Sequence, residues 1–112
     1  MKNGDRLPRI WSPEAKEDLF DIWNYVWLDA NAVIADKLLK EIDGACFVLG
    51  AWPEYGRARN DVRKGLRSIV VSRYVVFYRV TKNAIEIVRV LDERRDVQTI
   101  FPDEHGAVPL VD

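Results

Sequence analysis

The sequence predicts an α+β fold of two layers, in which an antiparallel β-sheet is covered on one face by a hairpin of two helices, in the order β-α-α-β-β-β. Two stretches with helical periodicity fill the first half of the chain, and three short runs rich in β-branched and aromatic residues follow. Connections of only two or three residues make neighbouring helices and neighbouring strands antiparallel. Helices that precede such a sheet in the chain pack together on one of its faces.

Length and composition fit one globular domain. The chain has 112 residues, of which 48% are hydrophobic and 31% charged, and this length is enough to bury one core. We expect a single domain over residues 1–112 with short tails at about 1–6 and 102–112. No apolar run approaches the roughly 20 residues of a membrane-spanning helix, and the first residues lack the apolar part of a signal peptide. We therefore expect a cytoplasmic protein with no membrane partner.

The residue types that support metal and disulfide chemistry are almost absent. The chain has one cysteine, Cys46, and one histidine, His105. A lone cysteine cannot close an internal disulfide, and the two residues offer no cluster of metal ligands. His105 lies in the acidic stretch FPDEHG, where a histidine is more often solvated than catalytic. We expect neither a metal nor a cofactor.

A short strand is expected within residues 6–12, and a helix begins directly after it. Ser12 can accept a hydrogen bond from a free amide of the first turn, and Pro13 fits the first helical position. The helix is expected to run through about Leu28. Its apolar residues recur at steps of three and four, as one buried stripe requires: Ala15, Leu19, Ile22, Trp23 and Val26.

A second helix follows the break at Asp29–Asn31. Asn31 can cap its start, and Gly50 with Pro53 ends it. The two helices then form an antiparallel hairpin. This helix has the most regular apolar stripe in the sequence: Ala35, Leu38, Leu39, Ile42, Ala45, Cys46 and Leu49.

The second half of the chain predicts a loop and three strands. The stretch 53–65 is polar, carries two glycines and shows neither the helical nor the strand period, so we interpret it as a loop. The strands expected after it are 66–71, 74–80 and 84–91, separated by short polar turns.

Positive charge is concentrated on these strands. The formal net charge is −1, yet the stretch 57–95 holds eleven Lys or Arg against four Asp or Glu, while the parts before and after it are acidic. Because side chains alternate across a strand, we expect Arg67, Arg79 and Arg89 on one face of the sheet, away from the helices.

Two interpretations of these three arginines remain open. Guanidinium groups bind oxyanions in a bidentate fork, so the arginines could form a surface for phosphate or for an acidic peptide. They could instead pair with carboxylates of the chain itself, such as Asp92, Glu93 and Asp96.

Three segments carry a family resemblance: WSPEAKEDLFDIWNYV, GRARNDVRKGLRSIVVSRYVVFYRV and IEIVRVLDERRD. Their order and spacing over about residues 9–101 resemble the ParE branch of the RelE/ParE toxin superfamily, the toxin half of bacterial type II toxin–antitoxin pairs. The resemblance implies the RelE/ParE-like fold, a helical hairpin against an antiparallel sheet. One difference is visible: many relatives read VLHGRRD, so that Asp92 and Glu93 here replace a usual histidine and glycine.

The resemblance to ParE implies a toxin that binds DNA gyrase, so that its cleaved DNA complex persists and replication is blocked. Such a toxin makes no bond itself, and we expect no catalytic residue and no sequence-specific binding of nucleic acid by the toxin alone. The groups expected to contact the target are Arg94, Arg95, Ile100 and Phe101.

Two alternatives belong to other functional classes. RelE-like relatives cut messenger RNA on the ribosome, which requires side chains that transfer protons and stabilise charge. The positions where those nucleases carry a lysine and an arginine fall near Ile69 and Val75, which are aliphatic, and guanidinium groups hardly titrate. The other alternative is a non-toxic adaptor whose sheet binds a peptide.

A toxin of this kind implies an antitoxin, here a ParD-like one, in a hetero-oligomer with the toxin. Its disordered C-terminal segment is expected to fold as an amphipathic helix along the toxin. Four aromatic residues, Phe20, Trp27, Phe47 and Trp52, fall outside or at the margin of the helical core stripes. They could anchor the antitoxin or serve as edge packing, and acidic antitoxin residues could meet Arg67, Arg79 and Arg89.

Overall fold

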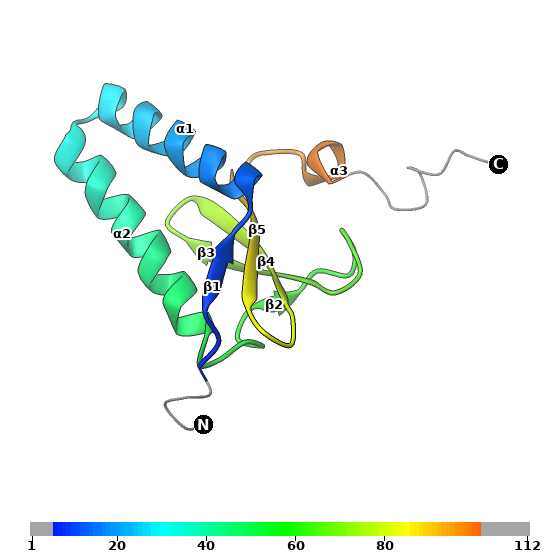
Figure 1. Cartoon of the computed structure of the whole chain (residues 1–112). Coiled ribbons are helices and arrows are strands. Elements are labelled where there is room, and N and C mark those ends of the chain that lie inside the picture. The colour runs from blue at the N-terminus through cyan, green and yellow to red at the C-terminus, as the bar shows by residue number, and fades with distance from the viewer. Residues whose placement is uncertain (1–5, 102–112) are drawn as a thin grey trace.

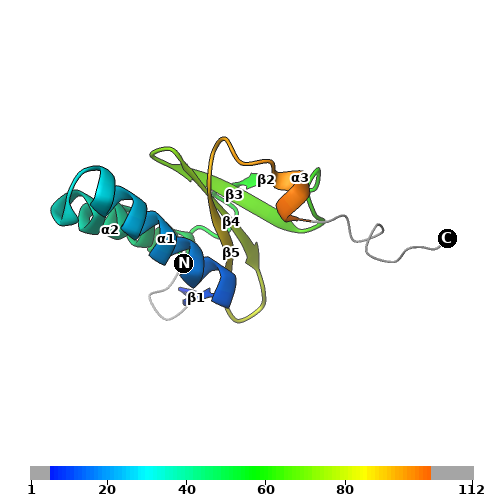
Figure 2. The ribbon, with the colours of Figure 1, turned by 90° about the horizontal axis from the view of Figure 1, so that it is seen from above.

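The protein consists of a five-stranded sheet with a helical hairpin on one side and a short helix on the other (Figures 1 and 2). The computed structural model describes residues 6–101, so most of both expected tails, and His105, lie outside the described residues. The elements in chain order are β1 (Arg9–Trp11), α1 (Pro13–Asp29), α2 (Ala32–Leu49), β2 (Arg57–Ala58), β3 (Leu66–Val71), β4 (Tyr74–Val80), β5 (Ile85–Asp92) and α3 (Val97–Ile100).

The sheet has the strand order β1-β5-β4-β3-β2. The three long strands β3, β4 and β5 are antiparallel, as predicted. The prediction of a wholly antiparallel sheet was wrong for β1, which pairs parallel with β5. Two helices separate β1 from the other strands, so no short turn dictates its direction. The two-residue strand β2 falls inside the predicted loop and is too short to show a period.

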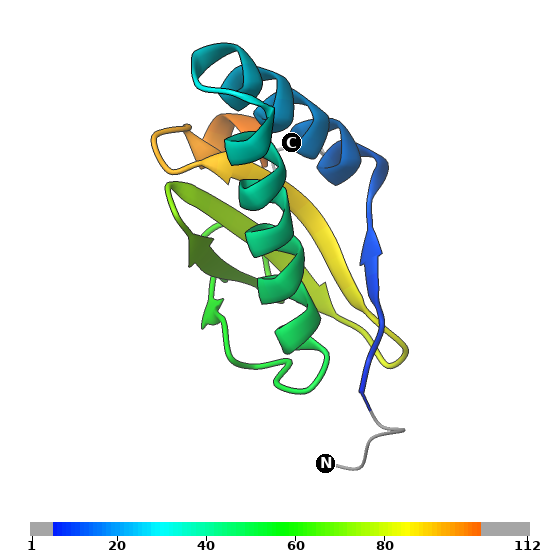
Figure 3. The same cartoon turned by 90° about the vertical axis from the view of Figure 1, so that its left-hand side faces the viewer.

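Side-chain caps start both long helices as predicted. The Ser12 hydroxyl accepts a hydrogen bond from the amide of Ala15 at 3.0 Å, and the Asn31 side chain accepts one from Ile34 at 2.9 Å. The connection between the helices is short, and the hairpin lies across one face of the sheet (Figure 3). Within the described residues, no helix is long and apolar enough to cross a membrane.

The main core lies between the hairpin and the sheet. Tyr78 is fully buried in it, and its hydroxyl donates to the carbonyl of Pro53 and accepts from the amide of Gly56, both at 2.8 Å. This tyrosine therefore fixes the loop after α2 against the sheet. A side chain at Gly56 would lie 2.5 Å from the same hydroxyl, so only glycine fits there. The buried residues of the main core are Ala15, Ile22, Ile42, Cys46, Leu49, Tyr74, Val76, Tyr78, Ile85, Ile87 and Val90.

A second, smaller core covers the other face of the sheet. The rings of Phe77 and Phe101 meet edge to face, with their centroids 5.0 Å apart, and Val97 and Ile100 of α3 pack beside them. Asp96 caps α3 by accepting from the amide of Gln98. This core was not predicted from the sequence. The helix α3 has only four residues, too few to show a helical period, and the alternation along a strand does not reveal which element covers each face of the sheet. Its buried members are Val62, Leu66, Phe77, Leu91 and Phe101.

The N-terminal half of α1 completes the outer edge of β5. Strand β1 pairs with β5 only as far as Ile87. Beyond that point, the Ser12 hydroxyl donates to the carbonyl of Val88 at 2.8 Å, and the Asp18 carboxylate accepts from the amide of Val90 at 2.9 Å. Asp18 also accepts two hydrogen bonds of 2.8 Å from Arg89. One carboxylate thus joins α1 to β5 at the position where the β4–β5 register shifts.

We predict that Asp18→Asn lowers the free energy of unfolding by about 2–3 kcal/mol, because it leaves the half-buried Arg89 without its anionic partner. Chemical denaturation followed by circular dichroism measures this change. The control is Glu86→Gln, which removes an ion pair whose two side chains are both exposed, Arg79 at 51% and Glu86 at 37%, and which should cost less than about 1 kcal/mol. Equal losses in both variants would contradict the role given to Asp18.

Candidate functional site

The three strand arginines do not share one face, so that prediction was wrong. Arg67 lies opposite Tyr78 in the β3–β4 register, and Tyr78 belongs to the main core under the hairpin. Arg79 lies opposite Leu66, which belongs to the second core on the other face. Arg67 and Arg79 therefore lie on opposite faces of the sheet, since directly opposed residues of an antiparallel pair share a face.

The error has a geometric cause. A two-residue turn at Ser72–Arg73 makes Val71 face Tyr74, so residues that share a face change from odd to even numbers across the turn. The irregularity in the β4–β5 register then shifts the pairing once more, and Arg89 lies opposite Phe77. The predicted alternation holds within β3 and β4 but was carried across the turn without this change, and within β5 the extra residue at the register shift breaks it, so that Ile87 and Val90 both lie in the main core.

Each of the three arginines has an acceptor within the chain. Arg67 donates to the backbone carbonyl of Gly56 at 2.6 Å. Arg79 and Arg89 form ion pairs with Glu86 and Asp18, at 2.7 Å and 2.8 Å. The interpretation of pairing with the chain's own carboxylates is thus confirmed for Arg79 and Arg89, although the partners are not Asp92, Glu93 or Asp96.

The four aromatic residues outside the helical stripes are exposed, but they lie in two places. At 100° per residue, Trp27 lies about 140° around α1 from the buried Ile22, and Phe47 about 140° around α2 from the buried Ile42. Phe20 and Trp27 lie on the exposed side of α1, and Phe47 lies on the exposed side of α2, where the guanidinium groups of Arg6 and Arg9 stack on its ring. We call these three residues the hairpin patch. The exposed fractions are 64% for Phe20, 46% for Trp27, 48% for Phe47 and 66% for Trp52.

Trp52 belongs to a separate apolar hollow between the end of α2 and the edge of β3. We call it the Trp52 patch. Tyr55 and Val70 in it are 75% and 68% exposed. Strand β2 pairs only with Arg67 and Ser68, so the outer edge of β3 beside this patch is open beyond Ser68. The patch is formed by Ala45, Val48, Trp52, Tyr55, Ile69 and Val70.

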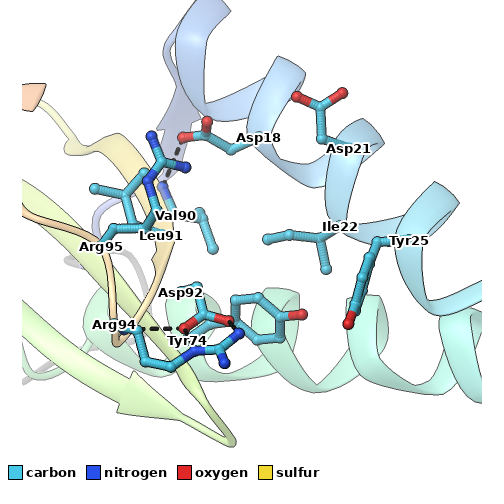
Figure 4. A pocket seen from close by; sticks show the side chains of 10 residues that line it. All are labelled: Asp18, Asp21, Ile22, Tyr25, Tyr74, Val90, Leu91, Asp92, Arg94 and Arg95. Atoms are coloured by element: carbon cyan, nitrogen blue, oxygen red, sulfur yellow. Dashed lines mark hydrogen bonds and ion pairs between the residues drawn. The ribbon is translucent and has the colours of Figure 1, made fainter. Parts of the chain in front are cut away.

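A pocket of about 220 Å³ lies where α1 faces the end of β5 (Figure 4). Acidic side chains from α1 and basic side chains after β5 meet across its mouth, and apolar side chains form its base. The expected target-contact residues Arg94 and Arg95 both line it. The lining residues are Asp18, Asp21, Ile22, Tyr25, Tyr74, Val90, Leu91, Asp92, Arg94 and Arg95.

Asp92 organises the basic side of this pocket. Its carboxylate accepts from the Nε and the backbone amide of Arg94, at 3.1 Å and 2.9 Å, and from the Nε of Arg73 at 2.9 Å. The hydrogen bonds from Arg94, followed by those from Arg73, lower the pKa of Asp92 to about 2. The Asp92 carboxylate therefore holds two arginines in place.

The four expected target-contact residues differ in accessibility. Arg94 and Arg95 are exposed, and Arg95 forms no ion pair with residues 6–101. Phe101 is only 2% exposed and belongs to the second core, and Ile100 is half-buried beside it. In this conformation Phe101 supports the sheet and offers no surface to a partner.

Several titratable groups of the described part have pKa values shifted away from neutrality. Burial raises the pKa of Cys46 to about 12, and it also raises the pKa of Tyr74 and of Tyr78. Hydrogen bonds from arginine lower the pKa of Asp61 and of Asp92. Each of these shifts moves the pKa away from 7, whereas a general acid or base works best with a pKa near the operating pH.

The two aliphatic positions compared with nuclease residues also lie apart. Ile69 packs against the main core and Val75 against the second core, on opposite faces of the sheet. A search of the described residues finds no group of three or more His, Cys, Asp or Glu side chains that could hold a metal ion.

Sequence reasoning missed several residues of these sites. The pairing of Asp18 with Arg89 joins residues 71 positions apart, and no local pattern indicates it. The pairing of Arg73 with Asp92 could have been found from the hairpin register, since Tyr74 lies opposite Asp92. Arg63 falls in the predicted loop and was given no role there, but it lines a second pocket with Arg79 and Glu86.

Comparison with known proteins gives one consistent answer. Residues 9–97 match the family described as the ParE toxin of the type II toxin–antitoxin system parDE. The chain is 36% identical to Toxin ParE1 of Mycobacterium tuberculosis over 89 residues, which cover 79% of this chain and 91% of the relative. It is 32% identical to Toxin ParE3 of Caulobacter vibrioides over 80 residues, 71% of this chain and 80% of the relative.

A solved structure has the same fold. It is described as the chromosomal ParDE TA system from P. aeruginosa, and it superimposes with a TM-score of 0.69 at 20% sequence identity. The match covers 79% of this chain and 97% of that one. At this level of identity, the similarity is evidence for the fold.

We predict that Asp92→Asn lowers the melting temperature above about pH 5 and that the difference from the unsubstituted protein shrinks progressively as the pH falls toward 1. The folded pKa of about 2 lies below the unfolded value of about 3.9, so the stabilisation is fully present above about pH 5 and is lost as the pH falls through the folded pKa. Thermal melts between about pH 1.5 and 6 measure it. Arg94→Gln should reproduce part of the effect and Arg95→Gln none. A difference that is as large at about pH 1.5 as at pH 6 would contradict this account.

Proposed function

The chain belongs to the ParE toxin family of type II toxin–antitoxin systems, and from that membership we propose that it arrests growth by binding DNA gyrase in the cytoplasm. In this proposal the toxin occupies a surface of gyrase, the cleaved DNA complex persists, and replication stops. The toxin forms and breaks no bond. The observation that carries the proposal is the family match over residues 9–97.

The electrostatics of the described residues support action by binding. The shifted pKa values of the cysteine, tyrosine and aspartate side chains all move away from neutrality. Two of the strand arginines are held in ion pairs within the chain, and a guanidinium group hardly titrates. A ribonuclease on this sheet would need a proton donor and acceptor that these residues do not provide.

We propose that Arg94 and Arg95 contact gyrase. Both are exposed and follow directly after the end of β5, in a stretch fixed by Asp92. The pocket beside them has an apolar base, including Ile22 and Leu91, which could receive a side chain of the target. Ile100 and Phe101 act at a distance in this proposal, by packing α3 onto the sheet and so holding the preceding basic stretch.

We further propose that a ParD-like antitoxin neutralises the toxin by covering the hairpin patch and the Trp52 patch. Both carry exposed aromatic side chains, the residue type enriched in binding hot spots. They lie on different sides of α2, so one segment must wrap around the toxin to cover both. Of the three strand arginines, Arg79 is the most exposed to an acidic partner, since Arg67 and Arg89 are half-buried and engaged within the chain.

The gyrase proposal predicts that the purified protein, added to gyrase and supercoiled plasmid, causes linear cleaved DNA to accumulate. The double variant Arg94→Ala/Arg95→Ala should need about tenfold more protein for the same cleavage, because it loses two exposed charges of the contact. Arg57→Ala, an exposed arginine at the far edge of the sheet, is the matched control and should act like the unsubstituted toxin.

Two results would refute the gyrase proposal and assign another class. Messenger RNA cut at codons on translating ribosomes, with gyrase unaffected, would identify a RelE-like endonuclease. Expression that leaves growth unchanged, with no antitoxin present and folded protein in the cell, would favour the non-toxic adaptor.

The antitoxin proposal predicts that Phe20→Ala and Trp52→Ala each weaken binding of a ParD-like antitoxin about 30-fold or more, as loss of a hot-spot aromatic residue does. Titration calorimetry measures the affinity, and melting temperatures should change little, because both side chains are largely exposed. Val33→Ala, at a side chain that is 76% exposed in neither patch, is the control and should alter affinity less than about threefold. Unchanged affinity in both aromatic variants would show that the antitoxin does not bind through these patches.

A further inference from the structure

Arg63 is a half-buried arginine whose side chain finds no hydrogen-bond acceptor among residues 6–101. It lies shortly before β3, and its guanidinium carbon is 5.3 Å from the centre of the Phe101 ring. Its Nε is buried without an acceptor, and it is the one buried side-chain nitrogen or oxygen of the described part in that condition. The charge of Arg63 is therefore not neutralised by the part of the chain that the structure describes.

The other half-buried arginines of the described part behave differently. Each donates to a carboxylate or to a backbone carbonyl within the chain. A guanidinium group removed from water without an acceptor is costly, and buried donors in native proteins are almost always satisfied. Arg63 is therefore the half-buried arginine of the described part whose guanidinium group has no anionic partner there. The arginines with acceptors are Arg9, Arg59, Arg67, Arg73 and Arg89.

Arg63 lines a pocket of about 370 Å³ near the end of the sheet where β1 joins α1. Arg79 and Glu86 form an ion pair in its wall, so the lining carries one net positive charge. Ser12 and Pro13 bring the start of the 17-residue helix α1 to the same wall, and the helix dipole adds positive potential there. The remaining lining is apolar: Ile10, Trp11, Leu66, Ile87 and Val88.

We propose that this pocket binds a carboxylate side chain of a partner peptide, with the two outer guanidinium nitrogens of Arg63 as bidentate donors and the apolar wall receiving a neighbouring hydrophobic side chain. A planar carboxylate matches the guanidinium fork. One net positive charge suits a single carboxylate, whereas a nucleic acid backbone requires several uncommitted cations along its path. Glu86 in the wall also disfavours a polyanion. The site is separate from Arg94, Arg95 and both aromatic patches, so it does not depend on the gyrase target.

The test is a titration of the full-length protein with acetyl-Leu-Glu-Leu-amide, followed through the Nε–Hε signals of arginine in proton–nitrogen NMR spectra. The Arg63 signal should shift and saturate, while the glutamine analogue of the peptide and inorganic phosphate should cause no saturating shift. Arg63→Lys keeps the positive charge and the aliphatic part of the side chain but loses the paired N–H donors of the guanidinium group. It should weaken binding about tenfold. Arg57→Lys, at an exposed arginine outside the pocket, should bind the peptide like the unsubstituted protein.

Several results would overturn the proposal. Equal binding of the glutamate and glutamine peptides would show that the carboxylate is not recognised, and saturation by phosphate alone would assign the pocket to a phosphate ligand. Unchanged affinity in Arg63→Lys, with an unchanged melting temperature, would exclude Arg63 as the donor. A gain in affinity on replacing the two acidic residues that follow Phe101 in the sequence, as Asp103→Asn/Glu104→Gln, would show that the chain's own carboxylates already occupy the pocket.

Discussion

The carboxylate of Asp18 is the contact on which the arrangement of the hairpin and the sheet depends. Strand β1 covers the outer edge of β5 for only three residues, and α1 takes over where β1 ends. Asp18 satisfies the amide of Val90 and holds the guanidinium of Arg89 at the register shift. Because α2 follows α1 after a short connection, fixing α1 in this way also sets the position of α2 over the main core.

This constraint explains why a chain of nearly neutral net charge carries so many arginines on its strands. Most of the arginines in residues 6–101 hold the fold together, as Arg89 does with Asp18, Arg73 with Asp92, and Arg79 with Glu86. The first two pairs are half-buried, whereas the Arg79 and Glu86 side chains are 51% and 37% exposed. Ion pairing of this kind places charge in the sheet without creating a continuous basic surface. Arg63 and Arg95 have no side-chain acceptor in that part of the chain.

Local patterns in the sequence were enough to predict β1, the two long helices and the three long strands, but not β2 or α3. Ser12 and Asn31 mark the helix starts because a capping side chain must directly precede the first turn, and the predicted alternation holds along β3 and β4. The relative phase of the strands was not predictable in this way, since the turn at Ser72 and the shift opposite Phe77 each change which residues share a face. The burial of Phe101 was missed for a related reason: it depends on Phe77, 24 positions earlier, and on no local period.

The same geometry limits how the protein can act. A catalytic site needs groups whose pKa values lie near the working pH and whose side chains converge on one point. Here the carboxylate at the end of β5 is held ionised by two arginines, and the tyrosine hydroxyl in the main core is used to fix a loop. Both groups therefore stabilise the structure. The exposed aromatic patches and the basic stretch after β5 lie on different sides of the domain, so a partner that contacts all of them must extend around it.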